Sequence, residues 1–517
     1  MEKHKLEVKH SCIKINNYEL GDLPATEKFF SIWDKGKFKA FPKGMKYDED
    51  TKTLYLPRGT SISILERSLG VNAFIDMHHD PIQQVNPIML KYLPRDDVQR
   101  EGIKFILGKG EYEYTARKSQ ISVNLSPGEG KTYLTVAAAA YHGVRMAMIT
   151  SNVEWINQWF EKIQEYTDTT ADEIYIIRGK TSIVMLLNGM HDISRYKFIL
   201  CSHGTLKSYG DRYGWDKVGE LFRFMGIGLK IYDEAHLYFD NICAVDFATD
   251  TYKTIYLTAT PARSDRFEDK IYQASFKSVP SLDLFDDERD PRTHYVAFHY
   301  SSEPSPVQVQ HCRGRYGFNI IKYVDYVTRR PNFYELLFIL LEIAKTKGRT
   351  LIYIGKIDAI YRVYGWINYN FPELRGMVGM CHSGIDPSLK AAEKQKFIIL
   401  STTKSCGAAS DISGLKLTIN LADPFSSHVT AIQTLGRTRD RDTMYIDVVD
   451  NGFATLKSYY QHKQGVFAKR ALDFRDVILK RDMLHEKYRQ MFENKMEWYC
   501  KLYSKNQDEK TKVMHLV

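Results

Sequence analysis

The sequence has no long apolar run and no recognisable export signal. Nothing in its 517 residues approaches the roughly 18 consecutive apolar residues that span a bilayer. The opening stretch, MEKHKLEVKH, contains no apolar core and no small-residue cleavage site, so we expect no secretory signal. These features predict a cytoplasmic protein, in the host cytoplasm if a virus or phage encodes it, with no membrane partner.

Paired metal-binding or disulfide-forming cysteines are also missing. The seven cysteines stand at positions 12, 201, 243, 312, 381, 406 and 500, and none forms a CxxC pair. This scatter argues against a zinc knuckle or a disulfide framework, so we expect most cysteines to be small buried side chains. His78 and His79 lack a second ligand pair at zinc spacing, and a solvated loop is favoured over a metal site.

Strong charge imbalance is absent too. Lys and Arg number 72 against 63 Asp and Glu, a net charge of +9, which by itself indicates a nucleic-acid partner only weakly. Hydrophobic residues make up 44% and charged residues 26% of the chain, an ordinary globular composition. The length allows three or four domains.

Two sets of β-rich runs dominate the chain, and each run precedes a turn or an amphipathic stretch. The first set is MAMIT, KFILCS, LKIYDEA and TIYLTAT, and the second is RTLIYIG, MVGMCHSG, KFIILST, LTINLAD and MYIDVVD. This alternation is typical of parallel sheets covered by helices. We therefore predict an α/β fold with two tandem parallel-sheet domains.

The expected domain limits follow from changes in composition. We predict a small N-terminal α+β accessory domain over 1–85, a first sheet domain over 86–290, a connector over 291–330, a second sheet domain over 331–455 and a helical extension over 456–517. Lys37 and Lys39, beside Phe38 and Phe41, fit nucleic-acid contact or half-buried sheet aromatics equally well. The aromatic residues of the extension recur at helical spacing, which favours a packing helix over a DNA-binding arm.

The strongest local motif is NLSPGEGKTYLTVAAAA, a phosphate-binding loop between a β-run and an Ala-rich helix. Its glycines let backbone N–H groups surround phosphates at a helix N-terminus. Lys131 would neutralise the β- and γ-phosphates, and the Thr132 hydroxyl would bind Mg²⁺. Leu125 replaces the usual leading glycine. The predicted nucleotide-binding residues of this loop are Gly128, Glu129, Gly130, Lys131 and Thr132.

About a hundred residues later, IYDEAH ends an apolar run. Asp233 would hold Mg²⁺, and Glu234 would orient or deprotonate the attacking water. Two adjacent carboxylates at a strand end are costly in a core unless cations accompany them. After a phosphate loop and before TATP, this pair is better explained by a nucleotide site than by a surface position.

With the segments around them, these motifs resemble the superfamily 2 helicases, of the DEAH type, over residues 93–450. The resemblance implies two RecA-like domains that bind ATP and Mg²⁺ between them. It assigns adenine contact to Gln99 in LPRDDVQ and coupling to His236, Thr258 and Thr260 in DEAH and TATP. In ITSNVEWINQW and CSHGTL it implies nucleic-acid contacts by Thr150, Ser151, Ser202 and Thr205.

The second half continues the resemblance with two departures. CHSG and STTKSCGAASDISGL imply nucleic-acid contacts by Gly384 and Thr402 and a nucleotide contact by Asp411. QTLGRTR resembles motif VI, with Gln433 and Arg437 as catalytic residues and Arg439 as a nucleotide contact. Ala409 stands where the family usually has glycine, and Asp440 where it has the last arginine. Either Arg439 or Arg441 would then be the second motif VI arginine.

The Gln158-Trp159 pair and the DEAH form are more similar to double-strand DNA translocases than to DEAD-type RNA helicases. Residues 1–85 resemble the N-terminal unit of virus-encoded repair and recombination helicases of the UvsW type, through FKAFPKGMKY and LYLPRG. The resemblance implies a monomeric DNA motor that works with replication or recombination proteins. Two alternatives stay open: an RNA-directed, transcript-releasing motor, and an ATP-gated clamp that does not unwind.

Overall fold

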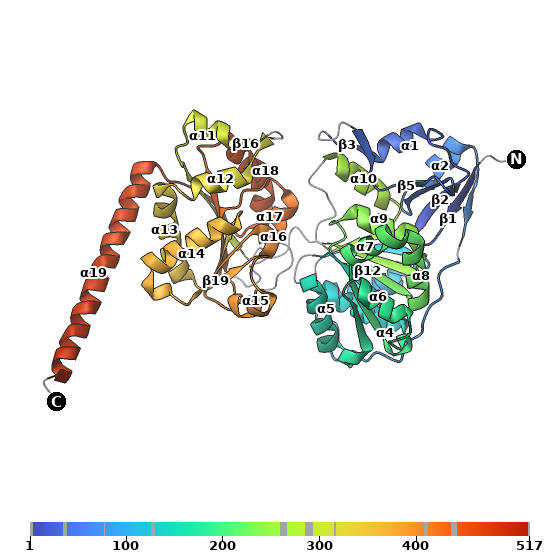
Figure 1. The fold of residues 1–517 in the computed structure, drawn as a ribbon, viewed down its shortest axis with the longest axis horizontal. Coiled ribbons are helices and arrows are strands. Elements are labelled where there is room, and N and C mark those ends of the chain that lie inside the picture. The colour runs from blue at the N-terminus through green and yellow to red at the C-terminus, as the bar shows by residue number, and fades with distance from the viewer. Residues whose placement is uncertain are drawn as a thin grey trace. The chain divides into compact units, whose positions relative to one another are not determined.

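The computed structural model describes residues 4–34, 39–76, 78–125, 130–151, 153–258, 266–284, 293–314, 317–406, 412–435 and 442–514. The chain divides into two compact units, Met1–Asp286 and Asp287–Val517. Each contains a seven-stranded sheet (Figure 1), and every strand pair in both sheets is parallel. The predicted α/β class with two parallel sheets is confirmed.

The sheet of the first unit is built from short, apolar, buried strands such as MAMIT, whose side chains are all buried. Burial on both faces explains why these strands do not alternate between polar and apolar residues. Across the sheet the order is β10 (Ile174–Ile177), β11 (Phe198–Ser202), β9 (Met146–Thr150), β12 (Leu229–Tyr232), β13 (Lys253–Thr258), β8 (Gln120–Asn124) and β14 (Ser281–Asp283).

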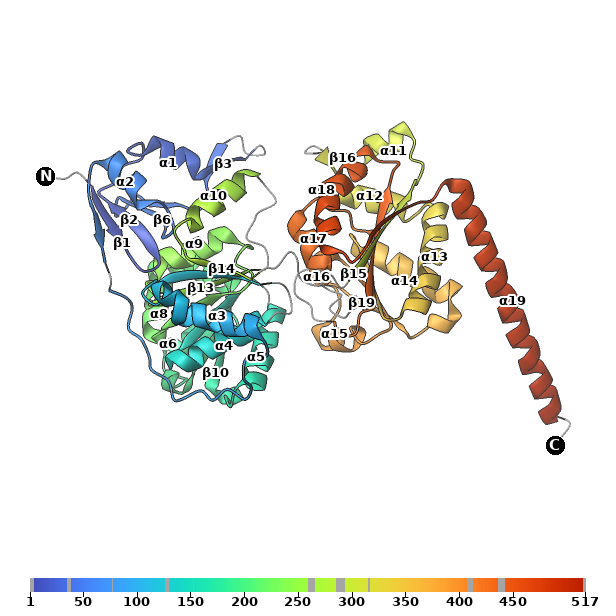
Figure 2. The ribbon, with the colours of Figure 1, turned by 180° about the vertical axis from the view of Figure 1, so that it is seen from behind.

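Helices cover both faces of this sheet, as the front and back views show (Figures 1 and 2). Two separate hydrophobic clusters result, one on each face. One face carries α3 (Asp97–Leu107), α4 (Lys131–His142) and α5 (Val153–Tyr166). The other carries α6 (Lys180–Leu187), α7 (His203–Tyr213), α8 (Trp215–Met225) and α9 (Phe239–Ala248).

The N-terminal region is α+β, as predicted, and within the first unit it packs against α9 and α10. Its sheet has the order β5 (Lys46–Asp48), β6 (Thr53–Pro57), β2 (Cys12–Asn16), β1 (Lys5–Val8) and β7 (Ala73–Ile75). Leu54 and Leu56 share one hydrophobic core with Phe239, Phe247 and Tyr272. The remaining elements here are α1 (Pro24–Phe29), α2 (Ile62–Leu69), the ribbon of β3 (Ser31–Asp34) and β4 (Lys39–Pro42), and α10 (Arg266–Phe276).

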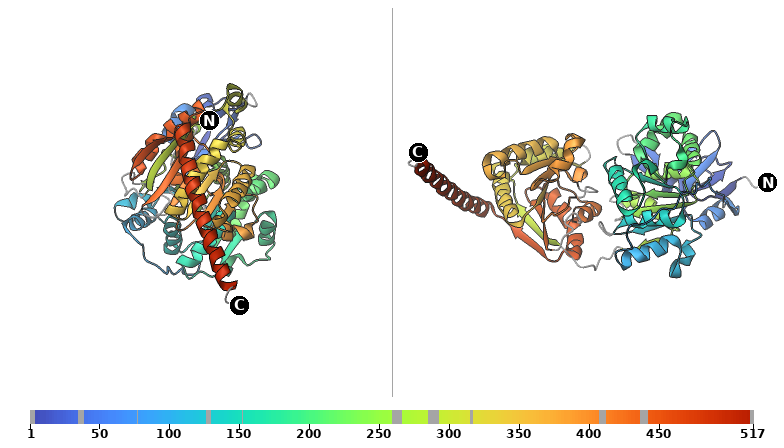
Figure 3. Two further views of the ribbon diagram at one scale, coloured as in Figure 1. Left: turned by 90° about the vertical axis from the view of Figure 1, so that its left-hand side faces the viewer. Right: turned by 90° about the horizontal axis from the view of Figure 1, so that it is seen from below.

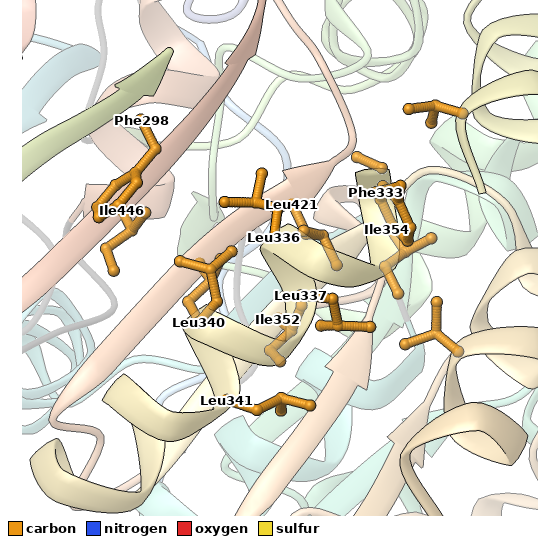
Figure 4. Packing of buried hydrophobic residues seen from close by; sticks show 14 of the residues in the cluster. Phe298, Phe333, Leu336, Leu337, Leu340, Leu341, Ile352, Ile354, Leu421 and Ile446 are labelled. Atoms are coloured by element: carbon orange, nitrogen blue, oxygen red, sulfur yellow. The ribbon is translucent and has the colours of Figure 1, made fainter. Parts of the chain in front are cut away.

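In the second unit the sheet order is β19 (Val378–Cys381), β20 (Ile398–Ser401), β18 (Thr350–Ile354), β21 (Leu417–Ala422), β22 (Thr443–Asp450), β15 (Thr293–Tyr300) and β23 (Phe474–Ile478). Leucines of α13 (Pro331–Lys347) lie against the strands (Figure 4). Other elements are α11 (Pro306–His311), β16 (Arg313–Gly314), β17 (Gly317–Phe318), α12 (Ile320–Val327), α14 (Ile357–Asn370), α15 (Pro387–Glu393), α16 (Thr403–Cys406), α17 (His428–Leu435) and α18 (Ala454–Arg470).

Two segments contribute more to this sheet than the sequence suggested. The expected connector, 291–330, supplies β15, which pairs with both β22 and β23. The expected helical extension supplies β23 before its last helix. THYVAFHY, the sequence of β15, has the β-branched and aromatic content of a strand. We predicted a connector instead because the stretch before it is rich in Asp and Pro.

The last helix, α19 (Arg481–Met514), packs through its N-terminal part. Leu484 is buried, and the Tyr488 ring lies 5.2 Å from the Phe338 ring of α13. Farther on, the helix extends beyond the rest of its unit (Figure 3). Packing of the first turns agrees with the predicted packing helix.

Three smaller expectations concern membranes, cysteines and histidines. No helix within the described ranges has the length and apolar character to cross a bilayer. The cysteines whose side chains are described are all buried, as expected: Cys12, Cys201, Cys243, Cys312 and Cys381. The His78 side chain is 97% exposed, as expected for a solvated loop.

Candidate functional site

The phosphate loop and the two carboxylates lie at one edge of the first sheet. β8 ends at Asn124 and β12 ends at Tyr232. Because all strands are parallel, their carboxyl ends meet at the same edge, where α/β proteins bind ligands. Lys131 opens α4 directly after Gly130, so the helix N-terminus faces this edge and favours an anion there.

Gly130 has a backbone φ of 92°, a left-handed conformation that glycine adopts without strain. A Cβ atom at this position would lie 2.2 Å from the side-chain amide nitrogen of Gln99, so the Gln99 side chain would have to shift. Gln99 is itself buried on α3, and its side-chain oxygen accepts the backbone N–H of Arg95 at 2.8 Å. The structure thus places Gln99, the predicted adenine contact, beside Gly130.

Lys131 and Glu234 form a buried ion pair. Lys131 Nζ donates to Glu234 Oε1 at 3.0 Å, and the two side chains are 12% and 10% exposed. Glu234 also has a φ of 51°, which is uncommon for a residue with a side chain. Backbone strain of this kind is often found at functional sites.

Asp233 is fixed from two sides. Its Oδ2 accepts the indole N–H of Trp159 at 2.8 Å, and its Oδ1 accepts the backbone N–H of Glu234 at 3.0 Å. Burial, together with the negative charge of Glu234, raises the pKa of Asp233 to about 6. A carboxylate with a raised pKa gains most from a nearby cation.

These groups fit ATP and Mg²⁺. The Asp233 carboxylate and the Thr132 hydroxyl offer the oxygen ligands that Mg²⁺ prefers, and Thr132 follows Lys131 in the first turn of α4. Lys131 and the helix N-terminus suit phosphates.

A chain of close polar contacts leads away from the carboxylates. His236 Nδ1 lies 3.3 Å from Glu234 Oε2 and 2.8 Å from Thr258 Oγ1, at the end of β13. The contacts run in order from Lys131 through Glu234 and His236 to Thr258. The residues predicted for coupling lie in direct contact with the predicted catalytic glutamate.

Ser202 and Thr205 lie together at the start of α7. Ser202 Oγ accepts the backbone N–H of Thr205 at 3.1 Å as the helix N-cap. Both line a hollow of about 310 Å³ together with Lys180, Arg212 and Tyr213. The two cations, which we had not predicted as contacts, both lie over the Tyr213 ring. Arg212 follows Thr205 at helical spacing, a signal that could have found it.

The other predicted nucleic-acid contacts are more scattered. Thr150 ends β9 with its side chain fully buried, whereas Ser151 is partly exposed. In the second unit, Gly384 follows β19 and Thr402 follows β20. These strands are neighbours, so both residues lie at one sheet edge.

Of the predicted nucleotide-site residues in the second unit, the structure describes only Gln433 of motif VI. Gln433 lies on α17 and is 8% exposed. The remaining predicted residues fall outside the described ranges: Gly128, Glu129, Thr260, Asp411, Arg437 and Arg439.

Trp159 is the residue of this site whose contact the sequence did not reveal. The Gln158-Trp159 pair suggested a family subtype, yet Trp159 is 2% exposed and bonds the predicted metal ligand. Its place one turn after Trp155 on an amphipathic helix indicates only core packing. The hydrogen bond joins residues that are 74 positions apart, which no local pattern encodes.

Comparison with known proteins gives a partial family match. Residues 93–263 match the family described as Type III restriction enzyme, res subunit. No curated protein matches the sequence.

Solved structures give wider coverage at low identity. S. cerevisiae Dbp5 bound to RNA and ADP BeF3 is 15% identical, covers 77% of this chain and 92% of its own, and has a TM-score of 0.50. A Dbp5 point variant with the same ligands is 15% identical, covers 77% of this chain and 93% of its own, and has a TM-score of 0.51. T4 UvsW is 12% identical over 92% of this chain and 99% of its own, with a TM-score of 0.36. The Dbp5 likeness shows the tandem RecA-like fold.

Proposed function

We propose that this chain, which has the helicase-like ATPase fold of superfamily 2, couples ATP hydrolysis to movement along DNA. The observation that carries the proposal is the buried Lys131–Glu234 pair beside Asp233 at the end of β12. A phosphate-binding lysine and two carboxylates at the carboxyl edge of a parallel sheet are the parts that phosphoryl transfer to water requires.

Each group has a distinct role in this proposal. Lys131, Thr132 and Asp233 would hold ATP and Mg²⁺, which when bound would supply an activated γ-phosphoryl group. Glu234 orients the attacking water and accepts its proton. Lys131 must turn from Glu234 Oε1 toward the phosphates for that oxygen to reach water, while His236 keeps its contact with Oε2. Gln433, Arg437, Arg439 and Asp411 would complete the nucleotide site.

His236 and Thr258 would couple hydrolysis to movement, because their hydrogen bond connects His236, which contacts Glu234, to the end of β13. The proposed substrate is duplex or branched DNA, in replication, recombination or repair. Support comes from the Gln158-Trp159 pair and the excess of basic residues. The hollow with Lys180 and Arg212 fits a phosphate backbone, which gives binding without base specificity.

The test is steady-state ATPase activity at saturating single-strand DNA, duplex DNA, branched DNA and RNA, measured side by side. We expect one of the DNA forms to stimulate turnover most. Greater stimulation by RNA than by every DNA form would favour an RNA-directed motor, a rival supported by the fold shared with the RNA-bound Dbp5 structure.

Strand displacement and triplex displacement assays separate a motor from a clamp. A translocase removes a triplex-forming strand from duplex DNA in an ATP-dependent manner, even if it does not separate the duplex. ATP hydrolysis that is stimulated by DNA without either displacement would favour the ATP-gated clamp.

A further inference from the structure

A second basic hollow lies where the N-terminal sheet meets the first parallel sheet. It has a volume of about 270 Å³, and its charged lining is Lys9, Arg58, Arg117, Lys118 and Asp76, with His10 beside them. Asp76 is already engaged, because it accepts Lys9 Nζ at 2.9 Å and the backbone N–H of His78 at 2.9 Å. Lys9 also lies 3.6 Å from Asp250. The other charged residues of the lining are cations.

Three of these cations pair with no carboxylate in the part of the chain that the structure describes. Within the described ranges, the side chains of Arg58, Arg117 and Lys118 form no ion pair. Arg58 Nε is buried without a hydrogen-bond partner, and burial lowers the pKa of this guanidinium. Leaving a buried donor and charge uncompensated is costly. A bound anion would remove that cost.

The walls of the hollow are held firmly. The carbonyl of Gly59, next to Arg58, accepts the Ser278 hydroxyl at 2.8 Å. A Cβ atom on Gly59 would lie 2.1 Å from the Ser275 carbonyl oxygen, so the backbones are in close contact. On the other wall, Ser119 Oγ donates to the His10 carbonyl at 2.8 Å. A preorganised site loses little entropy when it binds.

This hollow is separate from the nucleotide site. Its lining includes Gln120, the first residue of β8, whereas the phosphate loop follows Asn124, the last residue of that strand. A five-residue strand separates them by about 13 Å. Thr150 and Ser202 also lie at the carboxyl ends of their strands, so the predicted motor contacts are on the opposite edge.

The cationic lining continues beyond this hollow. An adjoining hollow of about 240 Å³ shares Lys9 and adds Lys14 and Arg223, together with Asp80 and Asp250. The two carboxylates are engaged by Arg223 and Lys9, whereas Lys14 forms no ion pair within the described ranges. Arg117 and Lys118 are exposed at the other side. Successive cations along a surface suit a chain of phosphates better than a single small anion.

We propose that this hollow binds phosphates of a nucleic-acid backbone, as a second contact outside the motor's own binding surface. The inference rests on the proposed function for its ligand class. Arginine and lysine are the side chains that bind phosphates most strongly. A DNA arm held here leaves the carboxyl edge of the sheet free for the strand along which the protein moves.

The test compares charge variants on long and short DNA. The pocket variants are Arg58→Gln and the double variant Arg117→Gln/Lys118→Gln. The matched control is Lys28→Gln/Arg67→Gln, which removes two exposed charges of the N-terminal region that form no ion pair within the described ranges. Affinity is measured by fluorescence anisotropy over a salt series, with fluorescein-labelled branched DNA and a single strand of about 8 nucleotides, short enough for one binding surface.

We expect the pocket double variant to bind branched DNA about tenfold more weakly than the control. The slope of log affinity against log salt should fall by about 1 to 2, since each lost phosphate contact removes about 0.9. Affinity for the short strand should match the control. Arg58→Lys should retain more affinity than Arg58→Gln, which distinguishes lost charge from misfolding.

Two results would overturn the proposal: equal affinity of the pocket variants and the control for branched DNA, or equal loss on long and short DNA. Either result with normal DNA-stimulated ATPase activity leaves the proposed function intact. Selective loss on branched DNA without any stimulation of ATPase activity would support the hollow and reject the motor.

Discussion

Lys131 controls the electrostatics of both carboxylates. Its positive charge lowers the pKa of Asp233, which burial and Glu234 raise. Its direct partner is Glu234. Removal of Lys131 therefore removes a phosphate ligand and leaves two buried carboxylates side by side, an arrangement that disfavours ionisation of both.

We expect Lys131→Ala to lower ATP turnover by about two orders of magnitude or more, the scale seen when a transition-state charge partner is lost. DNA affinity should stay within about twofold, since the predicted DNA contacts come from other segments. ATPase rates and anisotropy titrations measure the two effects. Lys109→Ala, an exposed lysine of the same unit, is the control. Turnover like that of the unaltered protein would reject the site.

Trp159 positions the metal-binding carboxylate. Trp159→Phe keeps an aromatic ring in the core but removes the hydrogen bond to Asp233 Oδ2. Loss of a partner that orients a metal ligand weakens metal binding by about tenfold or more, so half-maximal ATPase activity should need about tenfold more Mg²⁺. Binding of Mn²⁺ in the presence of a nonhydrolysable ATP analogue gives a second readout.

Trp155→Phe provides the control for this prediction, because Trp155 is also buried on α5. It should leave the Mg²⁺ requirement unchanged. An equal Mg²⁺ requirement in the Trp159 and Trp155 variants would show that Trp159 serves packing alone.

His203 makes the first unit sensitive to acid. It is 1% exposed and stacks on Tyr232 at 5.7 Å between ring centroids, and burial lowers its pKa to about 4. Unfolding restores a pKa near 6.5, so the unfolded state binds more protons between these values. The contribution of neutral His203 to the free energy of unfolding is therefore present in full above about pH 6.5. It decreases as the pH is lowered, by about 2 kcal/mol at pH 5.

His203→Phe keeps an aromatic ring against Tyr232 but cannot bind a proton. Its free energy of unfolding should drop by about 2 kcal/mol less between pH 7 and pH 5 than that of the unaltered protein. Urea unfolding at both pH values measures this difference. His78→Phe changes an exposed side chain and should keep the full pH dependence. Equal pH dependence in the His203 variant would mean that the folded protein accommodates a charged imidazole.

Helix α19 illustrates how one element divides between packed and exposed faces. Leu484 is 1% exposed within the core of the second unit, whereas its neighbour Met483 is 54% exposed. We expect Leu484→Ala to lower the free energy of unfolding of this unit by about 2–4 kcal/mol. Met483→Ala should change it by less than about 0.5 kcal/mol.

Thermal and urea unfolding of the full chain measure both changes. Equal effects of the two substitutions would show that α19 does not pack stably on α13. The periodic aromatic residues predicted a packing helix here, but they did not show where packing ends, because that depends on the length of the surface that α13 offers.

Across the whole molecule, the sequence predicted what neighbouring residues encode. The loop before Lys131 and the carboxylates at 233 and 234 follow from short motifs, and the two sheets follow from runs of apolar residues. Contacts between segments far apart in the sequence could not be predicted. The bond from Trp159 to Asp233 and the hollow around Arg58 arise only when the chain has folded.

The N-terminal region shows the same limit. Its composition suggested a separate domain over residues 1–85, yet Leu54 and Leu56 share a core with Phe239 and Phe247. Apolar side chains on the two sides of a shared core cannot be told from those of two separate cores by pattern alone. The shared core implies that the N-terminal sheet and the first parallel sheet unfold together.

Gly59→Ala tests this cooperativity, because its new Cβ would meet the Ser275 carbonyl oxygen at 2.1 Å and push the N-terminal region away from α10. Overpacking of this kind costs about 1–3 kcal/mol. Native-state hydrogen exchange should show equal losses for the amides of β2 and of β9. Gly465→Ala, with nothing within 4 Å of the added carbon, should leave both unchanged. A loss confined to β2 would mean that the N-terminal sheet opens alone, and the basic hollow around Arg58 would then open with it while the nucleotide site stayed folded.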